Sequence, residues 1–149
     1  MDSFSLKGDD SFIIVTCLEV YDLNETAGHW GHFDISATIE ISSRSFTVTS
    51  GLDTGTGELY DLYQSLKKCN YELSGTVTYG NYAHELEMSI VYDDLGHVAV
   101  KGRYSETGQY SNRLEFEFKT DQTFINNTLQ ELGGIVNKYG DRRTWPSSA

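Results

Sequence analysis

The sequence predicts an α+β fold, in which a strongly twisted, mostly antiparallel sheet of about seven strands carries two packed helices, the longer one C-terminal. Many segments alternate apolar and polar residues, which is the pattern of strands with one buried face. Two other segments repeat apolar residues at steps of three and four, as amphipathic helices do. The two patterns meet in residues 112–124. The predicted fold is therefore built around a strand that leads directly into a long helix.

The strand of this junction places Leu114, Phe116 and Phe118 on one face and charged residues on the other. The period then changes, and Thr120 or Asp121 can accept from the first N–H groups of a helix. The apolar stripe of that helix is formed by Ile125, Leu129, Leu132, Val136 and Tyr139. The other predicted helix has Thr56 as its cap, ends at Asn70 and carries Leu59, Leu62, Tyr63, Leu66 and Cys69 on one face.

The predicted strands are residues 11–20, 33–41, 44–49, 71–79, 86–90, 98–104 and 114–118. The outward faces of the last three are acidic, basic and acidic in turn. In an antiparallel meander Glu87 and Glu117 can therefore flank Lys101 or Arg103, and such cross-strand pairs disfavour a slipped register. We expect residues 1–149 to form a single domain, with a frayed start at 1–10 and a polar tail at 141–149.

The net charge of the chain limits the classes of partner that it can bind. Eleven Lys and Arg residues stand against 22 Asp and Glu residues, which gives a net charge of −11 and an isoelectric point near 4.6. This balance argues against nucleic-acid binding, which needs clustered cations, and is compatible with a basic protein partner. No signal peptide and no apolar run long enough to span a bilayer are visible, so we expect a cytoplasmic protein that does not contact a membrane.

Catalytic and metal-binding motifs are weak. His29 and His32 form the best candidate metal pair, but no third ligand accompanies them. Residues 51–57 are rich in glycine without the spacing of a phosphate loop. Cys17 and Cys69 form no CxxC motif and fit small buried residues better than a disulfide. The sequence therefore predicts neither an enzyme nor a cofactor.

A protein-binding surface is a better-supported site. Exposed tyrosines among acidic residues are common in such surfaces, although ordinary strand propensity also explains them. The carboxylates alternate with Lys and Arg, which favours a charge-paired surface over acid–base catalysis. The candidate partner-binding residues are Glu85, Glu87, Glu115, Glu117, Tyr82 and Tyr92.

The order of features in the second half resembles the WapI-type immunity proteins of bacteria. The resemblance covers about residues 12–139 and rests on scaffold features. Its motifs are Tyr63-Gln-Ser-Leu66, Leu73-Ser-Gly75, Glu85-Leu-Glu87, Gly96-His-Val-Ala-Val-Lys-Gly102, Asn112-Arg-Leu-Glu-Phe-Glu-Phe118 and Asp121-Gln-Thr-Phe124. The resemblance implies a stoichiometric inhibitor of the toxic C-terminal domain of a contact-dependent growth-inhibition toxin, and it assigns no binding residue. The alternative is a non-catalytic small-molecule-binding or regulatory domain of a bacterial cytosolic protein. A nuclease is one candidate for the toxin's activity, and the resemblance assigns neither that activity nor the oligomeric state.

Overall fold

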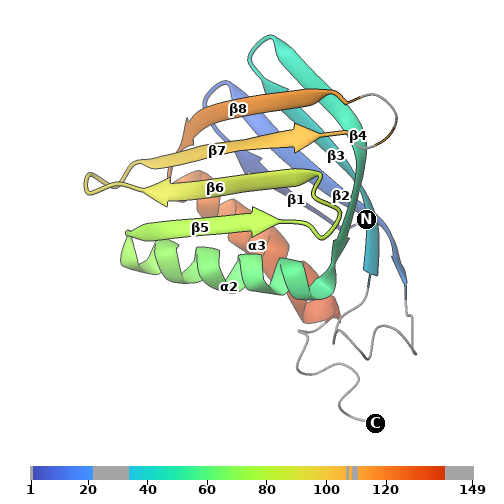
Figure 1. Ribbon diagram of the computed structural model, residues 1–149. Coiled ribbons are helices and arrows are strands. Elements are labelled where there is room, and N and C mark those ends of the chain that lie inside the picture. Colours follow the sequence, from blue (N-terminus) through green and yellow to red (C-terminus); the bar gives the residue numbers. More distant parts are fainter. Residues whose placement is uncertain (1, 22–33, 107, 109–110, 140–149) are drawn as a thin grey trace.

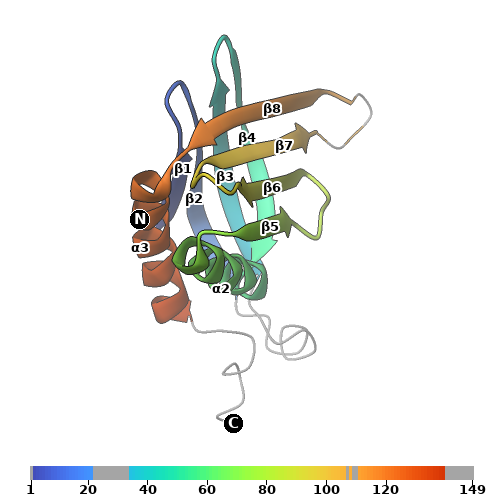
Figure 2. The ribbon, with the colours of Figure 1, turned by 90° about the vertical axis from the view of Figure 1, so that its left-hand side faces the viewer.

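A computed structural model of the chain describes residues 2–21, 34–106, 108 and 111–139, and its architecture is α+β. Within these residues eight antiparallel strands form two sheets of four, and two helices pack beside them (Figures 1 and 2). The predicted fold class and the longer C-terminal helix are thus confirmed. The strands are divided between two sheets, where the sequence predicted one.

Each sheet is a meander of consecutive strands. Sheet A has the order β1-β2-β3-β4, and sheet B has the order β5-β6-β7-β8. The strands of sheet A are β1 (Ser3–Lys7), β2 (Ser11–Tyr21), β3 (Asp34–Ser43) and β4 (Phe46–Gly55). Those of sheet B are β5 (Gly75–Gly80), β6 (Leu86–Tyr92), β7 (Val98–Ser105) and β8 (Arg113–Thr120). Helix α2 (Thr56–Glu72) connects the sheets, and α3 (Gln122–Tyr139) follows sheet B.

The core lies between the two sheets and the two helices. Sheet B crosses sheet A steeply, while α2 lies beside β5 and α3 beside β1 (Figure 1). Every element contributes buried apolar side chains to this one cluster, including Ile13, Ile39, Leu66, Ile90, Val100, Phe118 and Leu132. Burial of an apolar side chain of this size stabilises the fold by roughly 1.5–3 kcal/mol. Alternate residues of β3, β6 and β7 lie in this core, among them Ile35 and Ile41, Leu86 and Met88, and Val98 and Tyr104.

The start of the chain differs from the frayed end that its polarity suggested. Residues Ser3–Lys7 form β1, which pairs with β2 in antiparallel register. Phe4 and Leu6 alternate with polar residues and are buried at 4% and 2% exposure. Two apolar residues are too few to identify a strand by alternation, so this strand was missed.

Helix α2 also departs from its predicted limits. Its N-cap is Gly55, which has no side chain to accept a hydrogen bond, and Thr56 is already helical. The helix continues past Asn70 to Glu72, and Leu73 follows it with a left-handed backbone at φ 57°. The strand predicted from residue 71 therefore begins only at Gly75. The alternation of residues 71–79 predicted the wrong start for this strand, because Tyr71 and Leu73 belong to the end of the helix and are exposed.

The beginning of α3 is as predicted for Asp121. The backbone N–H of Phe124 donates to Asp121 Oδ1 at 3.0 Å, which satisfies one of the first helical donors. Further along, α3 contacts the outer edge of β1. The N–H of Ser5 donates to Glu131 Oε1 at 2.9 Å, and Thr128 Oγ1 donates to the carbonyl of Ser5 at 2.6 Å. The last helix thus satisfies backbone groups of the first strand.

A buried amide joins the two sheets at the β5–β6 connection. Asn81 is 2% exposed, and its Nδ2 donates to the carbonyl of Asp53 on β4 at 2.8 Å. Its Oδ1 accepts from the N–H groups of Glu85 and Leu86, both at 2.9 Å. One side chain therefore fixes the turn into β6 and holds that turn against β4.

We expect Asn81→Ala to lower the free energy of unfolding by about 2–3 kcal/mol, because it leaves these buried backbone groups without partners. The matched control is Asn112→Ala, since Asn112 is exposed and donates to Glu106 at the surface. That control should change stability by less than about 0.5 kcal/mol. Urea unfolding measures both values, and equal losses would contradict the bridging role of Asn81.

Candidate functional site

Three of the predicted binding carboxylates lie on the outer face of sheet B. Arg103 of β7 stands between Glu87 of β6 and Glu115 of β8 in the strand register. In the next row Lys101 stands opposite Glu117. Arg103 Nη2 forms an ion pair with Glu87 Oε1. The predicted alternation of acidic and basic strands is confirmed. Glu87 and Glu117 do not flank the same cation, however, because they lie in different rows of the register.

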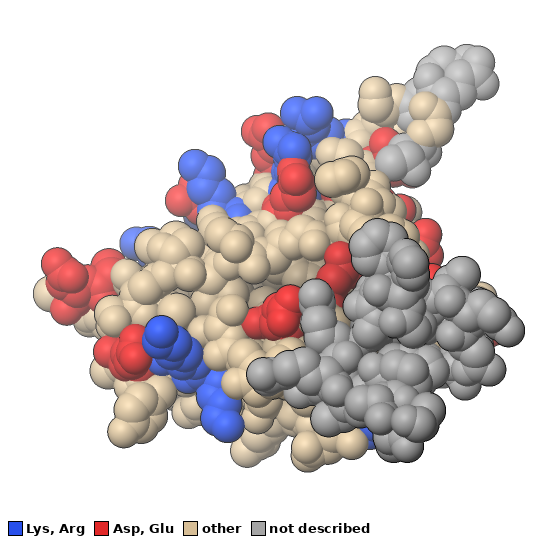
Figure 3. Space-filling model, turned by 60° about the horizontal axis from the view of Figure 1, so that its bottom comes forward, with Lys and Arg blue, Asp and Glu red and all other residues tan. Residues whose placement is uncertain are grey.

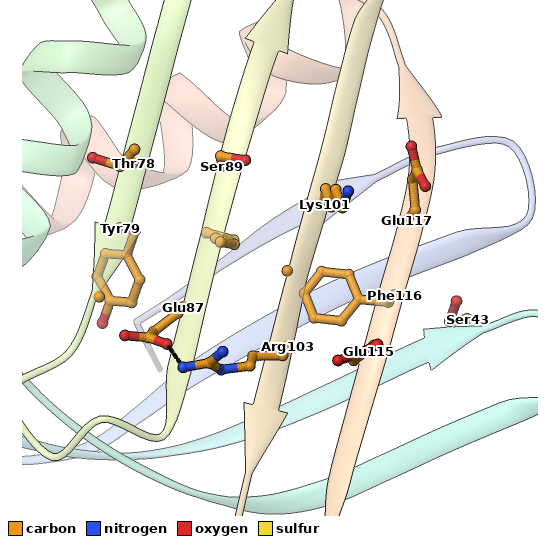
Figure 4. Close-up of a pocket in the computed structure, with 13 residues that line it drawn as sticks. Ser43, Thr78, Tyr79, Glu87, Ser89, Lys101, Arg103, Glu115, Phe116 and Glu117 are labelled. Carbon is orange, nitrogen blue, oxygen red and sulfur yellow. Dashed lines mark ion pairs between the residues drawn. The ribbon is translucent and has the colours of Figure 1, made fainter.

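A shallow groove of about 970 Å³ follows this face. Figure 4 shows Glu87 turned toward Arg103, with Lys101 and Glu117 on neighbouring strands. Exposed ion pairs of this kind contribute about 0–1 kcal/mol each, and solvent screens their field. Acid–base catalysis needs a carboxyl group whose pKa is shifted by a dry environment. The groove does not provide that environment, because its carboxylates lie on an open, solvated face.

Two further candidates, the exposed Tyr82 and the half-buried Glu85, lie at the β5–β6 connection. Glu85 Oε1 accepts from the N–H of Asp53 at 3.0 Å and from Asn81 Nδ2 at 3.0 Å. Tyr82 is 53% exposed. These two residues therefore belong to a different surface, at the end of the molecule where β4 leads into α2.

We call this surface the acidic end and define it by Glu19, Asp34, Asp53, Glu58, Glu85, Tyr21 and Tyr82. The strand register assembles part of it, because Glu19 and Asp53 both pair with Ser36, while Tyr21 pairs with Asp34. Thr54 Oγ1 donates to Glu58 Oε1 at 2.8 Å in the first turn of α2. The positive end of the helix dipole favours a carboxylate in that position.

The two tyrosines of the acidic end lie close to its carboxylates. Partial burial, followed by the negative charges of Asp34, Asp53, Glu58 and Glu85, raises the pKa of Tyr82 to about 12. The charge of Glu19, with a smaller effect of Asp53, raises the pKa of Tyr21. In Figure 3 the carboxylates at the centre of the described surface lie apart from the blue cationic side chains. Among the described residues, the charges gathered at this end are therefore acidic, whereas those on the sheet B face alternate in sign.

Tyr92 does not belong to either surface. It is 6% exposed, and its hydroxyl donates to Asn70 Oδ1 at 2.8 Å. Its burial raises the pKa of its hydroxyl group. The last residue of a strand looked exposed from the sequence, but the inward side of β6 continues to this position.

Asp34 and Asp53 are functional candidates that sequence reasoning missed. They come from β3 and β4, whereas Tyr82 and Glu85 follow β5, and only the packing of the two sheets brings them together. Asp53 also lies within the glycine-rich residues 51–57. No local motif could have identified this group.

The described residues contain no cluster of three His, Cys, Asp or Glu side chains suited to a metal ion. His29 and His32 lie outside them. Cys17 and Cys69 are free thiols, and burial raises the pKa of Cys17 to about 11. No helix in the described part of the chain is long and apolar enough to cross a membrane.

Comparison with known families identifies the scaffold. The model of the immunity protein WapI-like family matches residues 5–140. The chain belongs to this family. This membership supports an immunity-protein role, for which a protein toxin is the general class of partner, and it agrees with the resemblance noted in the sequence. No curated protein and no solved structure gave a match to this WapI-like chain.

We expect Asp53→Asn to lower the pKa of Tyr82 from about 12 toward its ordinary value of about 10, because it removes one nearby negative charge. Asp94→Asn is the control, since Asp94 lies in the β6–β7 turn and is not among the charges that act on Tyr82. NMR titration of isotope-labelled tyrosine, assigned with Tyr82→Phe, measures the shift. An equal pKa in wild type and Asp53→Asn would contradict the acidic end as described.

Proposed function

We propose that this chain is an immunity protein that binds the C-terminal domain of a cognate secreted bacterial toxin in the cytoplasm and inhibits it stoichiometrically, without catalysis. The observation that carries the proposal is the family match over residues 5–140. A contact-dependent toxin delivered into the cell is the partner that fits such a role. The inhibitor then protects the cell by occupying the toxin's functional surface.

The acidic end is the part of the proposed binding surface that the geometry favours. After partial burial, Asp34, Asp53, Glu58 and Glu85 all contribute to the raised pKa of Tyr82. On the sheet B face, by contrast, Glu87 forms an ion pair with Arg103, and Glu115 lies opposite the same cation in the strand register. Tyr21 and Tyr82 are 40% and 53% exposed and can supply the aromatic contacts that often dominate binding energy. Of the predicted binding residues, Tyr82 and Glu85 therefore stay in the proposal. Glu87, Glu115 and Glu117 become a secondary face, and the buried Tyr92 is left out.

A basic partner follows from this choice. Toxins that cleave nucleic acid need cationic clefts for the phosphate backbone, so a nuclease domain is the proposed toxin class. A net charge of −11 attracts such a cleft over long distances and accelerates encounter, while buried anchors determine the dissociation rate. The small-molecule alternative receives less support, because the groove on sheet B is shallow and lined mostly by polar and charged side chains.

Growth rescue and co-purification test the function itself. Co-expression with the C-terminal toxin domain encoded by the neighbouring gene should restore growth, and the two chains should co-purify in equal amounts. Loss of both results would exclude the proposed function.

If electrostatic attraction to the acidic end steers the toxin domain, its association rate should fall at least about tenfold between low and physiological salt. Asp53→Lys should slow association at low salt by about tenfold more than Glu115→Lys, although both substitutions change the net charge equally. Stopped-flow or surface binding kinetics measure these rates. An association rate that is indifferent to salt, or equal effects of the two variants, would exclude the acidic end as the steering surface.

A further inference from the structure

The edges of the two sheets are protected unequally. An edge strand presents unpaired N–H and C=O groups, and proteins usually cover such edges or guard them with charges. In sheet A, α3 lies along β1 and bonds to Ser5 through Glu131 and Thr128. In sheet B, α2 lies along β5 (Figures 1 and 2). The helices thus cover one edge of each sheet.

The two remaining edges, β8 and β4, differ in sequence. Strand β8 exposes a charged side chain at every second position, from Arg113 to Lys119. Such charges discourage pairing with another strand. The first six residues of β4, Phe46–Gly51 (FTVTSG), contain no charge and no proline. Uncharged segments rich in Phe, Thr and Val have a high tendency to pair with further strands.

The backbone of β4 offers its hydrogen bonds away from β3 at alternate residues. Tyr104 Oη donates to the carbonyl oxygen of Gly51 at 2.6 Å, so that carbonyl faces the free side. Thr49 and Thr47 lie two and four residues earlier and share its orientation. Among the described residues, no strand pairs with β4 on this side. The edge therefore offers about four main-chain hydrogen bonds to an added strand.

A groove of about 400 Å³ runs along this edge. One wall is residues 46–50 of β4, and the opposite wall includes Tyr104, Arg113 and Leu114 of sheet B. Phe46 is 68% exposed at its end, where the β3–β4 hairpin projects beyond sheet B (Figure 2). Val48 and Leu114 supply apolar contacts within it. The groove combines a bonding edge with an anchor for an apolar side chain.

We propose that the edge of β4 from Phe46 to Ser50 receives an extended segment of the partner, which adds a fifth strand to sheet A. This inference rests on the proposed function, because it takes the segment to belong to the toxin domain. Strand addition gives affinity through main-chain hydrogen bonds and specificity through alternate side chains. Thr47 and Thr49 supply the hydrogen bonds, and Phe46 and Val48 contact the side chains of the segment.

Charge favours a foreign, basic partner over a second copy of this chain. Two copies would each bring a net charge of −11 to a shared edge and repel one another. Strand β4 also continues into the acidic end, where Asp53 lies four residues after Thr49, or about 13 Å along the strand. One basic domain can therefore contact the acidic end and insert a strand beside Thr49 at the same time.

Thr49→Pro tests the proposal on the full chain. Proline removes the outward N–H and is tolerated at an edge whose N–H faces solvent. Thr49→Ala is the matched control, because it shortens the same side chain and keeps the N–H. With the neighbouring gene's toxin domain as the probe, we expect Thr49→Pro to raise Kd by at least about tenfold and Thr49→Ala by less than about twofold. Circular dichroism checks that both variants fold, and Thr47→Pro with Thr47→Ala replaces the pair if Thr49→Pro does not.

The outcomes separate this inference from the proposed function. If the wild-type chain binds the toxin domain and the proline variants bind it equally well, strand addition is overturned and the immunity role stays intact. Wild type that neither binds nor protects overturns the immunity role itself. A dimer in sedimentation that Thr49→Pro dissociates would show that a second copy occupies the edge, and would overturn the assignment to a toxin segment.

Discussion

Each sheet of this protein has one apolar face that it cannot bury alone. A four-stranded sheet with a single apolar face is stable only against another layer, so sheets A and B depend on each other. Because they cross steeply, part of the core is left open at their periphery, and α2 and α3 fill that space with Leu66 and Leu132. The positions of the helices, the exposed edge and the acidic end all follow from this arrangement.

The sequence predicts what is local along the chain. Strands β6, β7 and β8 are consecutive, so the alternation of their charges was enough to predict a basic strand between two acidic ones. It did not determine the register, which places Arg103 beside Glu87 and Lys101 beside Glu117. The apolar stripe and Asp121 likewise predicted most of α3. These features depend on residues within one meander or one helix, so the periodicity of the sequence was enough to predict them.

Features that join distant segments were not predictable in this way. The division into two sheets depends on whether the strand after α2 joins the first sheet or starts a second one. No pattern in residues 56–72 indicates which of the two occurs. The acidic end requires Asp34 from β3, Asp53 from β4 and Glu85 beside β6. Tyr92 is buried for a local reason, because the inward alternation of β6 continues two residues past the predicted end of the strand at residue 90.

The contact between α3 and β1 has a consequence for synthesis. Ser5 is bonded by Glu131, 126 residues later, and Lys138 is ion-paired with Asp2 at 3.1 Å. Contacts of such separation slow folding, because a large loop must close before they form. On the ribosome the first strand is made early, yet its edge stays uncovered until the last helix has emerged. A newly translated chain therefore completes this fold only after residues 122–139 have been made.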